Sequence, residues 1–214
     1  SFYLPDYVAL QKRFFDRYLK DIDNGWETEP RIRVAVRRPD GITRRPESEW
    51  PLARTEWTPY FLDAEARMMD VSRPEAAAVD FQAMGDGVTF YTAPFEAETE
   101  FTGPITARLF MSSSTTDLDV FATLRLFDPN DREVSFIGAH EETPVTRGWL
   151  RASHRKIDAE RSLPHRVVHS HDEIIKLAPG EIVALDVEIW PTSIVCSPGY
   201  RLALTIQGRD FQYK

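Results

Sequence analysis

The sequence has a single cysteine, no long hydrophobic run and no excess of positive charge. Because Cys196 has no second thiol within the chain to pair with, the disulfide-dependent secreted modules are excluded and a cytoplasmic location is expected. No apolar run approaches the roughly 20 residues of a membrane-spanning helix. Lys and Arg number 26 against 34 Asp and Glu, a net charge of −8. Nucleic acids and anionic membranes attract clustered cations, so we expect neither as a partner.

Motifs that carry catalytic or cofactor chemistry are also missing. None of the ten glycines begins the G-x-S-x-G turn on which α/β serine hydrolases hold their nucleophile. The sequence contains no phosphate-binding glycine loop and no dinucleotide fingerprint. We therefore assign no catalytic, cofactor-binding or metal-binding residue, and we expect no cofactor.

One segment near the start is predicted to be a helix. Asp6 is placed to cap its beginning, and Asn24-Gly25 is placed to end it. Between them, bulky apolar residues fall on one stripe at helical spacing: Phe14, Phe15, Tyr18, Leu19 and Ile22. A stripe of this kind requires a partner surface, either in this chain or in another domain.

The next segment, 31–86, is predicted to be irregular with short strands. Residues 31–37 alternate apolar and basic side chains, which is typical of a strand. Prolines interrupt 38–59 repeatedly, so no long regular element is expected there. Trp50 and Trp57 lie in this stretch, and we expect them to fix it onto a surface.

The remainder, 87–214, is predicted to be all β. Apolar alternation between turn signals marks several strands, at 88–91, 105–111, 118–127, 134–137, 182–190 and 200–206. Successive strands without intervening helices indicate a β-sandwich or jelly roll.

The five histidines suggest one candidate metal site. His169 and His171 would share one face of a strand, and His165, Asp172 or Glu173 could complete a set of ligands. The pattern H-x-H is loose, however, and no third ligand has a fixed spacing. We favour the alternative, a polar and solvated connection between strands.

Two features would suit a binding module. Asp117 and Asp119 could contribute to a Ca²⁺ site, although edge charges of a strand explain them more simply. Tryptophans could stack on sugar rings, although tryptophans more often fill a core or a seam between domains. The five are Trp26, Trp50, Trp57, Trp149 and Trp190.

Candidate nucleophiles are weak. Cys196 has no cationic neighbour in sequence to activate it, so we interpret it as a structural thiol. A self-contained triad built on His154 or His140 with a nearby serine and aspartate is the weakest hypothesis, because nothing in the sequence brings such groups together.

Several motifs in order nevertheless resemble one family. The run RGWLRASHR at 147–155 resembles the G-x-L-R-A-S-x-R signature of cocaine-esterase-like and X-Pro dipeptidyl-peptidase hydrolases. Further similar segments are SSTTDLDVF at 113–121, LFDP at 126–129, PGEIV at 179–183, IWPT at 189–192, GYRL at 199–202, and RFFDRYLK with NGW at 13–20 and 24–26. The resemblance thus covers nearly the whole chain.

The resemblance implies a non-catalytic part of a larger hydrolase. The family's C-terminal domain is a galactose-binding-like jelly-roll β-sandwich, which here would occupy 87–214 after the segment 31–86 and a linker helix within 1–30. Full-length members cleave esters or amides with a Ser-His-Asp triad in an α/β-hydrolase domain that precedes the linker helix. No catalytic residue is therefore expected here.

The resemblance also implies a partner. We expect a catalytic domain in cis, whose substrate pocket this chain helps to shape, with a second copy of the chain as a further partner at an oligomer interface. Family members continue past 208–210 into further strands. The sequence is therefore expected to be a piece of a longer protein, shortened at its C-terminal end.

Overall fold

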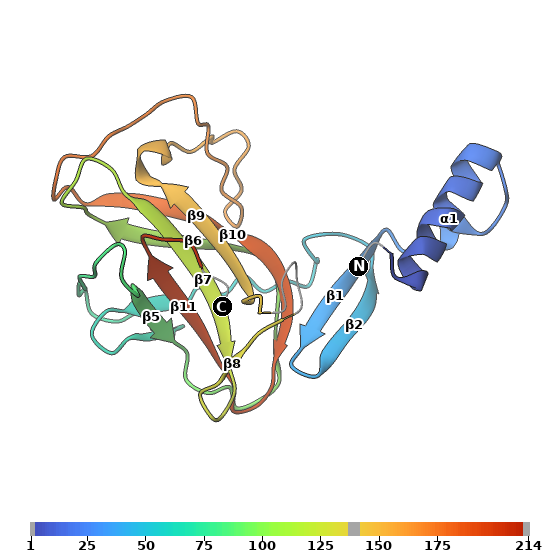
Figure 1. Ribbon diagram of the computed structural model, residues 1–214, viewed down its shortest axis with the longest axis horizontal. Coiled ribbons are helices and arrows are strands. Elements are labelled where there is room, and N and C mark those ends of the chain that lie inside the picture. Colours follow the sequence, from blue (N-terminus) through green and yellow to red (C-terminus); the bar gives the residue numbers. More distant parts are fainter. Residues whose placement is uncertain (1–2, 137–141, 212–214) are drawn as a thin grey trace.

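The structure is a computed structural model that describes residues 3–136 and 142–211 (Figure 1). Its only long helix within these ranges is α1 (Pro5–Lys20), which begins with a proline preset for the first helical turn. Asp6 lies inside that turn and does not cap it. The helix ends at Asp21, whose left-handed backbone (φ 53°) stops it before Asn24. No described helix is long and apolar enough to cross a bilayer.

A β-hairpin follows the short 3₁₀ turn η1 (Trp26–Thr28). Its first strand, β1 (Ile32–Arg38), confirms the predicted alternation, because Val34 and Val36 are buried whereas Arg33 and Ala35 are exposed. Its second strand, β2 (Gly41–Glu47), was not expected in a proline-rich stretch. It tolerates Pro46 because β2 lies at the edge of the sheet, where a missing N–H costs little.

The other described elements are strands, apart from one further 3₁₀ turn. They are β3 (Phe61–Asp63), β4 (Met68–Asp70), β5 (Val88–Tyr91), β6 (Thr99–Met111), β7 (Asp119–Phe127), β8 (Glu133–Val134), β9 (Thr146–Arg151), the 3₁₀ turn η2 (Ala152–His154), β10 (Val183–Cys196) and β11 (Arg201–Gln207). The predicted strands at 88–91, 118–127 and 200–206 match to within a residue. β6 and β10 are longer than predicted, β9 was missed, and the predicted strand 134–137 ends outside the described residues.

These strands form a sandwich of two layers. The hydrogen-bonded order is β2-β1-β10-β9-β7-β11-β5-β4-β3, with β6 on β10 and β8 on β7. In Figure 1, β7, β9 and β11 lie in front of β6 and β10. The layers are joined where Gly148 of β9 pairs with Ile189 of β10. The mainly β sandwich after an N-terminal helix confirms the predicted fold class.

The core fills the space between the two layers. One layer contributes alternate residues of β7 and β11, including Val120, Leu126 and Leu202. The other contributes alternate residues of β10, including Leu185 and Ile189, which are fully buried. Figure 1 shows α1 projecting away from this sandwich, beside the β1–β2 hairpin.

Candidate functional surface

The two aspartates considered for Ca²⁺ are already occupied within the chain. Asp117 accepts hydrogen bonds from the backbone N–H of Ser153 at 3.0 Å and from Lys176 Nζ at 2.8 Å. Asp119 pairs with Arg151 through two hydrogen bonds of 2.7 and 2.8 Å. The structure therefore supports their interpretation as strand-edge charges. It also shows that hydrogen bonds join the D-x-D motif directly to the R-A-S motif.

Asp117 is the strongly perturbed carboxylate of this joint. Although burial alone would raise its pKa, hydrogen bonds from Lys176 and Ser153 lower the pKa of Asp117 to about 2. The folded state thus prefers the ionised form. The resulting stabilisation is fully present above pH 4, near the pKa of an unfolded aspartate, and is lost as the pH falls towards 2.

We predict that Asp117→Asn lowers the free energy of unfolding by about 2 kcal/mol at pH 7. The variant should also lose less stability than wild type between pH 4 and pH 2.5. Urea unfolding at pH 7, 4 and 2.5 measures both effects. Asp21→Asn is the control, because the side chain of Asp21 is almost wholly exposed and its ion pair with Arg17 should contribute little. Identical pH profiles for wild type and Asp117→Asn would contradict the prediction.

The glycine of the R-G-W-L-R motif also has a structural role. Gly148 lies where β9 meets β10, and a Cβ placed there would be 1.9 Å from the backbone oxygen of Glu188 and 2.8 Å from the Cα of Ile189. No side chain fits at such distances. The glycine allows the two layers of the sandwich to join.

The candidate pair of His169 and His171, which the sequence analysis disfavoured, is not formed on a strand face. His171 has a left-handed backbone (φ 53°) rather than a strand conformation, so His169 and His171 do not share a strand face, and their ring centroids are 6.0 Å apart. His171 instead meets His154, with 3.2 Å between the two Nδ1 atoms. His165 lies elsewhere, stacked on Trp57 at 4.0 Å between centroids. The stacking fixes the proline-rich segment of Trp57 onto the sandwich, as expected for that tryptophan.

The remaining polar groups near these histidines have partners of their own. Lys156 binds both Asp172 and Glu173, at 3.1 and 3.2 Å.

His169 is partly buried beside this cluster. Burial, together with the neighbouring His171, lowers the pKa of His169. Its Nε2 is buried with no hydrogen-bond partner among the described residues.

The candidate nucleophiles are not placed for catalysis. Cys196 is fully buried at the end of β10, and burial raises the pKa of its thiol to about 12, as expected for a structural cysteine. Ser153, beside His154, is 1% exposed and hydrogen-bonded to Asp117. His140 lies outside the described residues. Within the described ranges, His154 contacts an imidazole rather than a serine hydroxyl.

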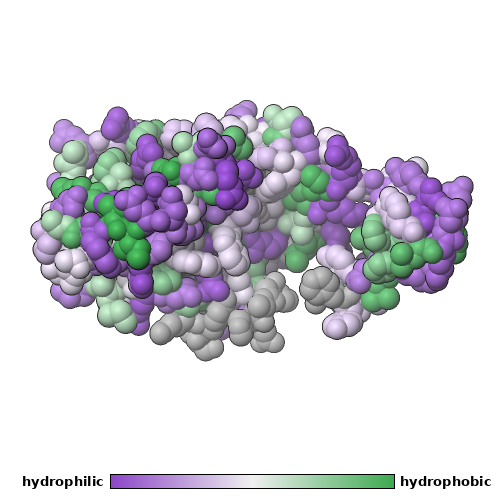
Figure 2. Space-filling view, turned by 90° about the horizontal axis from the view of Figure 1, so that it is seen from above, coloured by the Kyte–Doolittle hydropathy of each residue, from purple (hydrophilic) through white to green (hydrophobic). Residues whose placement is uncertain are grey.

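The first of two apolar surfaces lies on α1. Its predicted stripe is exposed, with each side chain between 41% and 76% accessible: Phe14, Phe15, Tyr18, Leu19 and Ile22. Figure 2 shows hydrophobic side chains gathered on this helix at the right-hand end of the molecule. The helix is held to the hairpin on another side, where Arg44 lies over the ring of Tyr7 at 5.0 Å. Ile22 follows the C-cap of the helix, and the other four lie on it. We call the five residues the α1 apolar face.

The second apolar surface contains tryptophans. Trp149 and Trp190 project from β9 and β10 with ring centroids 5.4 Å apart, and they are 48% and 56% exposed. Trp190 also lines an open groove of about 580 Å³ with Trp50 and with Ile32, Val34 and Ala35 of β1. Trp26 packs against Phe14 of α1. All five tryptophans thus lie outside the buried core, and two of them, Trp50 and Trp190, line this groove.

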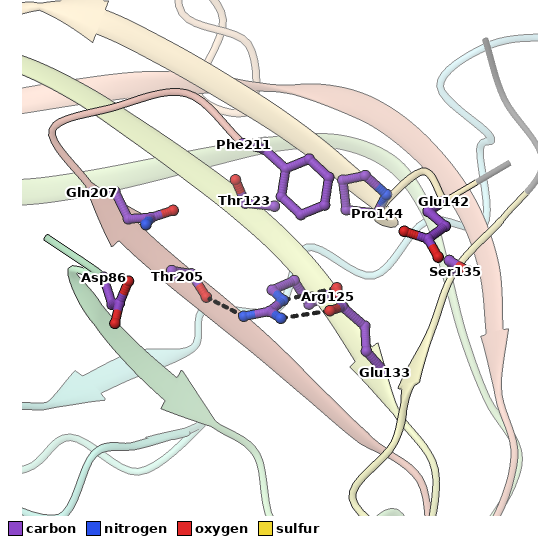
Figure 3. Close-up of a pocket in the computed structure, with 10 residues that line it drawn as sticks. All are labelled: Asp86, Thr123, Arg125, Glu133, Ser135, Glu142, Pro144, Thr205, Gln207 and Phe211. Atoms are coloured by element: carbon purple, nitrogen blue, oxygen red, sulfur yellow. Dashed lines mark hydrogen bonds and ion pairs between the residues drawn. The ribbon is translucent and has the colours of Figure 1, made fainter. Parts of the chain in front are cut away.

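A smaller pocket lies on the outer face of β7 and β11 (Figure 3). It has a volume of about 330 Å³, and Arg125 lies on its floor between Glu133 and Thr205. The Arg125 Nε donates to Glu133 at 2.8 Å, and this ion pair raises the pKa of Arg125. Because the arginine already has a carboxylate partner in the chain, the pocket does not present an unpaired cation to a ligand.

Comparison with solved structures extends over the whole chain. A CocE/NonD family hydrolase from Staphylococcus aureus superimposes with a TM-score of 0.93 at 30% sequence identity, covering 100% of this chain and 40% of that protein. The α1 helix and the sandwich are thus arranged as in part of a larger hydrolase.

Comparison of sequences gives the same result. A protein named as a serine esterase from Mycobacterium bovis is 28% identical over 92% of this chain and 35% of its own length. Cocaine esterase from a Rhodococcus species is 23% identical over 97% of this chain and 39% of its own length. These names give no support to a carbohydrate- or calcium-binding module. The chain spans less than half the length of these relatives.

A family model assigns the chain directly. Residues 24–214 match the model described as the X-Pro dipeptidyl-peptidase C-terminal non-catalytic domain. The match begins just after α1 and includes every strand of the sandwich. The chain belongs to the family of X-Pro dipeptidyl-peptidase C-terminal non-catalytic domains.

Proposed function

We propose that this chain is the non-catalytic C-terminal portion of a serine hydrolase that cleaves ester or amide bonds. In the full protein, the sandwich packs against an α/β-hydrolase domain in cis and helps to shape its substrate pocket. The relatives support this, since they are named as esterases or hydrolases and are more than twice as long as this chain. The single buried cysteine fits a reducing compartment, and we place the protein in the cytoplasm.

The observation that carries the proposal is the α1 apolar face. Four large apolar side chains on one helix, and Ile22 just after it, remain exposed, although the sandwich beside them has a complete core. Exposed apolar patches of this kind mark interaction surfaces. The helix precedes the sandwich in the chain, as a linker from an upstream domain would. We therefore assign the α1 apolar face to the catalytic domain, with a second copy of the chain as the alternative partner.

Hydrolysis assays test this division of labour. The isolated chain should show no turnover of a p-nitrophenyl ester, whereas the full-length protein should hydrolyse it with a saturable rate. Its upstream region should contain a G-x-S-x-G motif whose serine, replaced by alanine, abolishes turnover. Saturable hydrolysis by the isolated chain, abolished by one substitution within it, would overturn the proposal.

A further inference from the structure

The long connection between β9 and β10 brings two histidines together from separate segments. His154 ends the η2 turn, and His171 lies 17 residues later in the same connection. Their Nδ1 atoms are 3.2 Å apart, and their ring centroids are 5.3 Å apart. Both rings are accessible to solvent at this point. The motifs that carry the family resemblance do not account for this contact.

Backbone hydrogen bonds fix both histidines in place. The backbone N–H of Ser170 donates to the backbone carbonyl oxygen of Lys156 at 3.0 Å. The backbone N–H of Ile175 donates to the carbonyl oxygen of Ser153 at 2.8 Å. These two bonds hold the segment that carries His171 against the segment that carries His154. The left-handed backbone of His171 then turns its ring towards His154. The two nitrogens therefore face each other from two segments that are hydrogen-bonded together, which favours binding of a shared ligand.

Two facing imidazole nitrogens can interact in two ways. They can share one proton as an N–H···N hydrogen bond, or both can donate lone pairs to one metal ion. Two nitrogens bound at 2.0–2.1 Å to a tetrahedral Zn²⁺ would be about 3.3 Å apart. The observed 3.2 Å matches this separation closely. Imidazole also suits Co²⁺, Ni²⁺ and Cu²⁺.

We propose that His154 and His171 bind one divalent transition-metal ion of the zinc type through their Nδ1 atoms. In the described part of the chain, no group of three His, Cys, Asp or Glu residues is arranged to hold a metal. The carboxylates of the two residues that follow His171, Asp172 and Glu173, are engaged by Lys156. Water would therefore fill the remaining coordination positions of a bound ion. The ion would cross-link the two segments of the connection, independently of the proposed hydrolase function.

Co²⁺ binding to the chain, purified without a polyhistidine tag, tests this proposal. We expect one equivalent to bind with a visible d–d absorption band that Zn²⁺ abolishes by competition. His154→Asn and His171→Asn should each weaken binding by about tenfold or more. His165→Asn is the matched control, because that histidine stacks on Trp57 away from the pair, and it should bind as wild type does. Zn²⁺ should also raise the melting temperature of wild type and control but not of the two site variants.

Several results would overturn the proposal. These are absence of a Co²⁺ band in wild type, retention of binding in the double variant His154→Asn/His171→Asn, or equal loss in His165→Asn. Imidazole ¹H–¹⁵N spectra of the wild-type chain provide a readout that needs no variant. Zn²⁺ should shift the Nδ1 resonances of two histidines, and unchanged spectra would equally contradict the site.

Discussion

Gly148→Ala should destabilise the chain by about 3 kcal/mol or more and leave little folded protein. The added Cβ would lie 1.9 Å from the backbone oxygen of Glu188, well inside van der Waals contact. Flexible side chains can move away from a new methyl group, but a backbone carbonyl in the middle of β10 cannot. The two layers of the sandwich would have to separate where Gly148 pairs with Ile189.

Urea unfolding monitored by tryptophan fluorescence measures this effect, with expression yield as a second readout. The matched control is Gly41→Ala in the β1–β2 hairpin, where a Cβ would meet no atom within 4 Å. That variant should stay within about 0.5 kcal/mol of wild type. Equal stability of Gly148→Ala and wild type would show that the layers do not join through this glycine.

If the proposed function is correct, placing charges on the α1 apolar face should separate the domains of the full-length protein. The double variant Phe15→Asp/Leu19→Asp removes two exposed side chains from the proposed interface. Each buried apolar side chain of this size contributes about 1.5–3 kcal/mol, so together they contribute about 3–6 kcal/mol. We expect loss of most ester hydrolysis by the full-length protein, because the substrate pocket loses the neighbour that shapes it.

The isolated chain distinguishes this effect from simple misfolding. Since Leu19 is 76% exposed and α1 projects from the sandwich, the same double variant should leave the melting temperature of the isolated chain nearly unchanged. Met84→Asp is the matched control, because Met84 is 74% exposed but lies in a turn outside α1. Full activity of Phe15→Asp/Leu19→Asp would contradict the interface. Loss of self-association in the isolated chain would assign the face to a second copy instead.

The elements that the sequence predicts well are those whose pattern is local. The alternation in 118–127 and 200–206 produces β7 and β11 with little change of boundary, because one face of each packs on the core. The helical stripe on α1 is likewise visible from spacing alone. The predicted ends of the helix were wrong. It begins at Pro5, so Asp6 does not cap it, and it ends at Lys20 before Asn24, because Asp21 has a left-handed backbone.

Features that depend on distant neighbours could not be predicted in this way. β2 carries Pro46, which is acceptable because none of the described strands pairs with its outer edge. β9 is short and contains Gly148. A glycine is needed in this strand only because the backbone of β10 lies directly against it. The contact of His154 with His171 requires the left-handed turn at His171, which H-x-H spacing does not reveal. The sequence nevertheless carried the family resemblance, and two of its motifs are the segments 113–121 and 147–155, which hydrogen bonds to the carboxylates of Asp117 and Asp119 hold together.

The long strand β10 also determines when the protein can fold. It pairs with β6 along nearly its whole length, touches β9 through Ile189, and lies beside β1 through the pair Arg37–Ile194. Contacts across so many residues form slowly, because a long loop must close before any of them is gained. During synthesis at about 5–20 residues per second, the β1–β2 hairpin and β6 leave the ribosome long before β10 does. Their edges stay unpaired for that interval, so chaperone binding and aggregation compete with folding until β10 emerges.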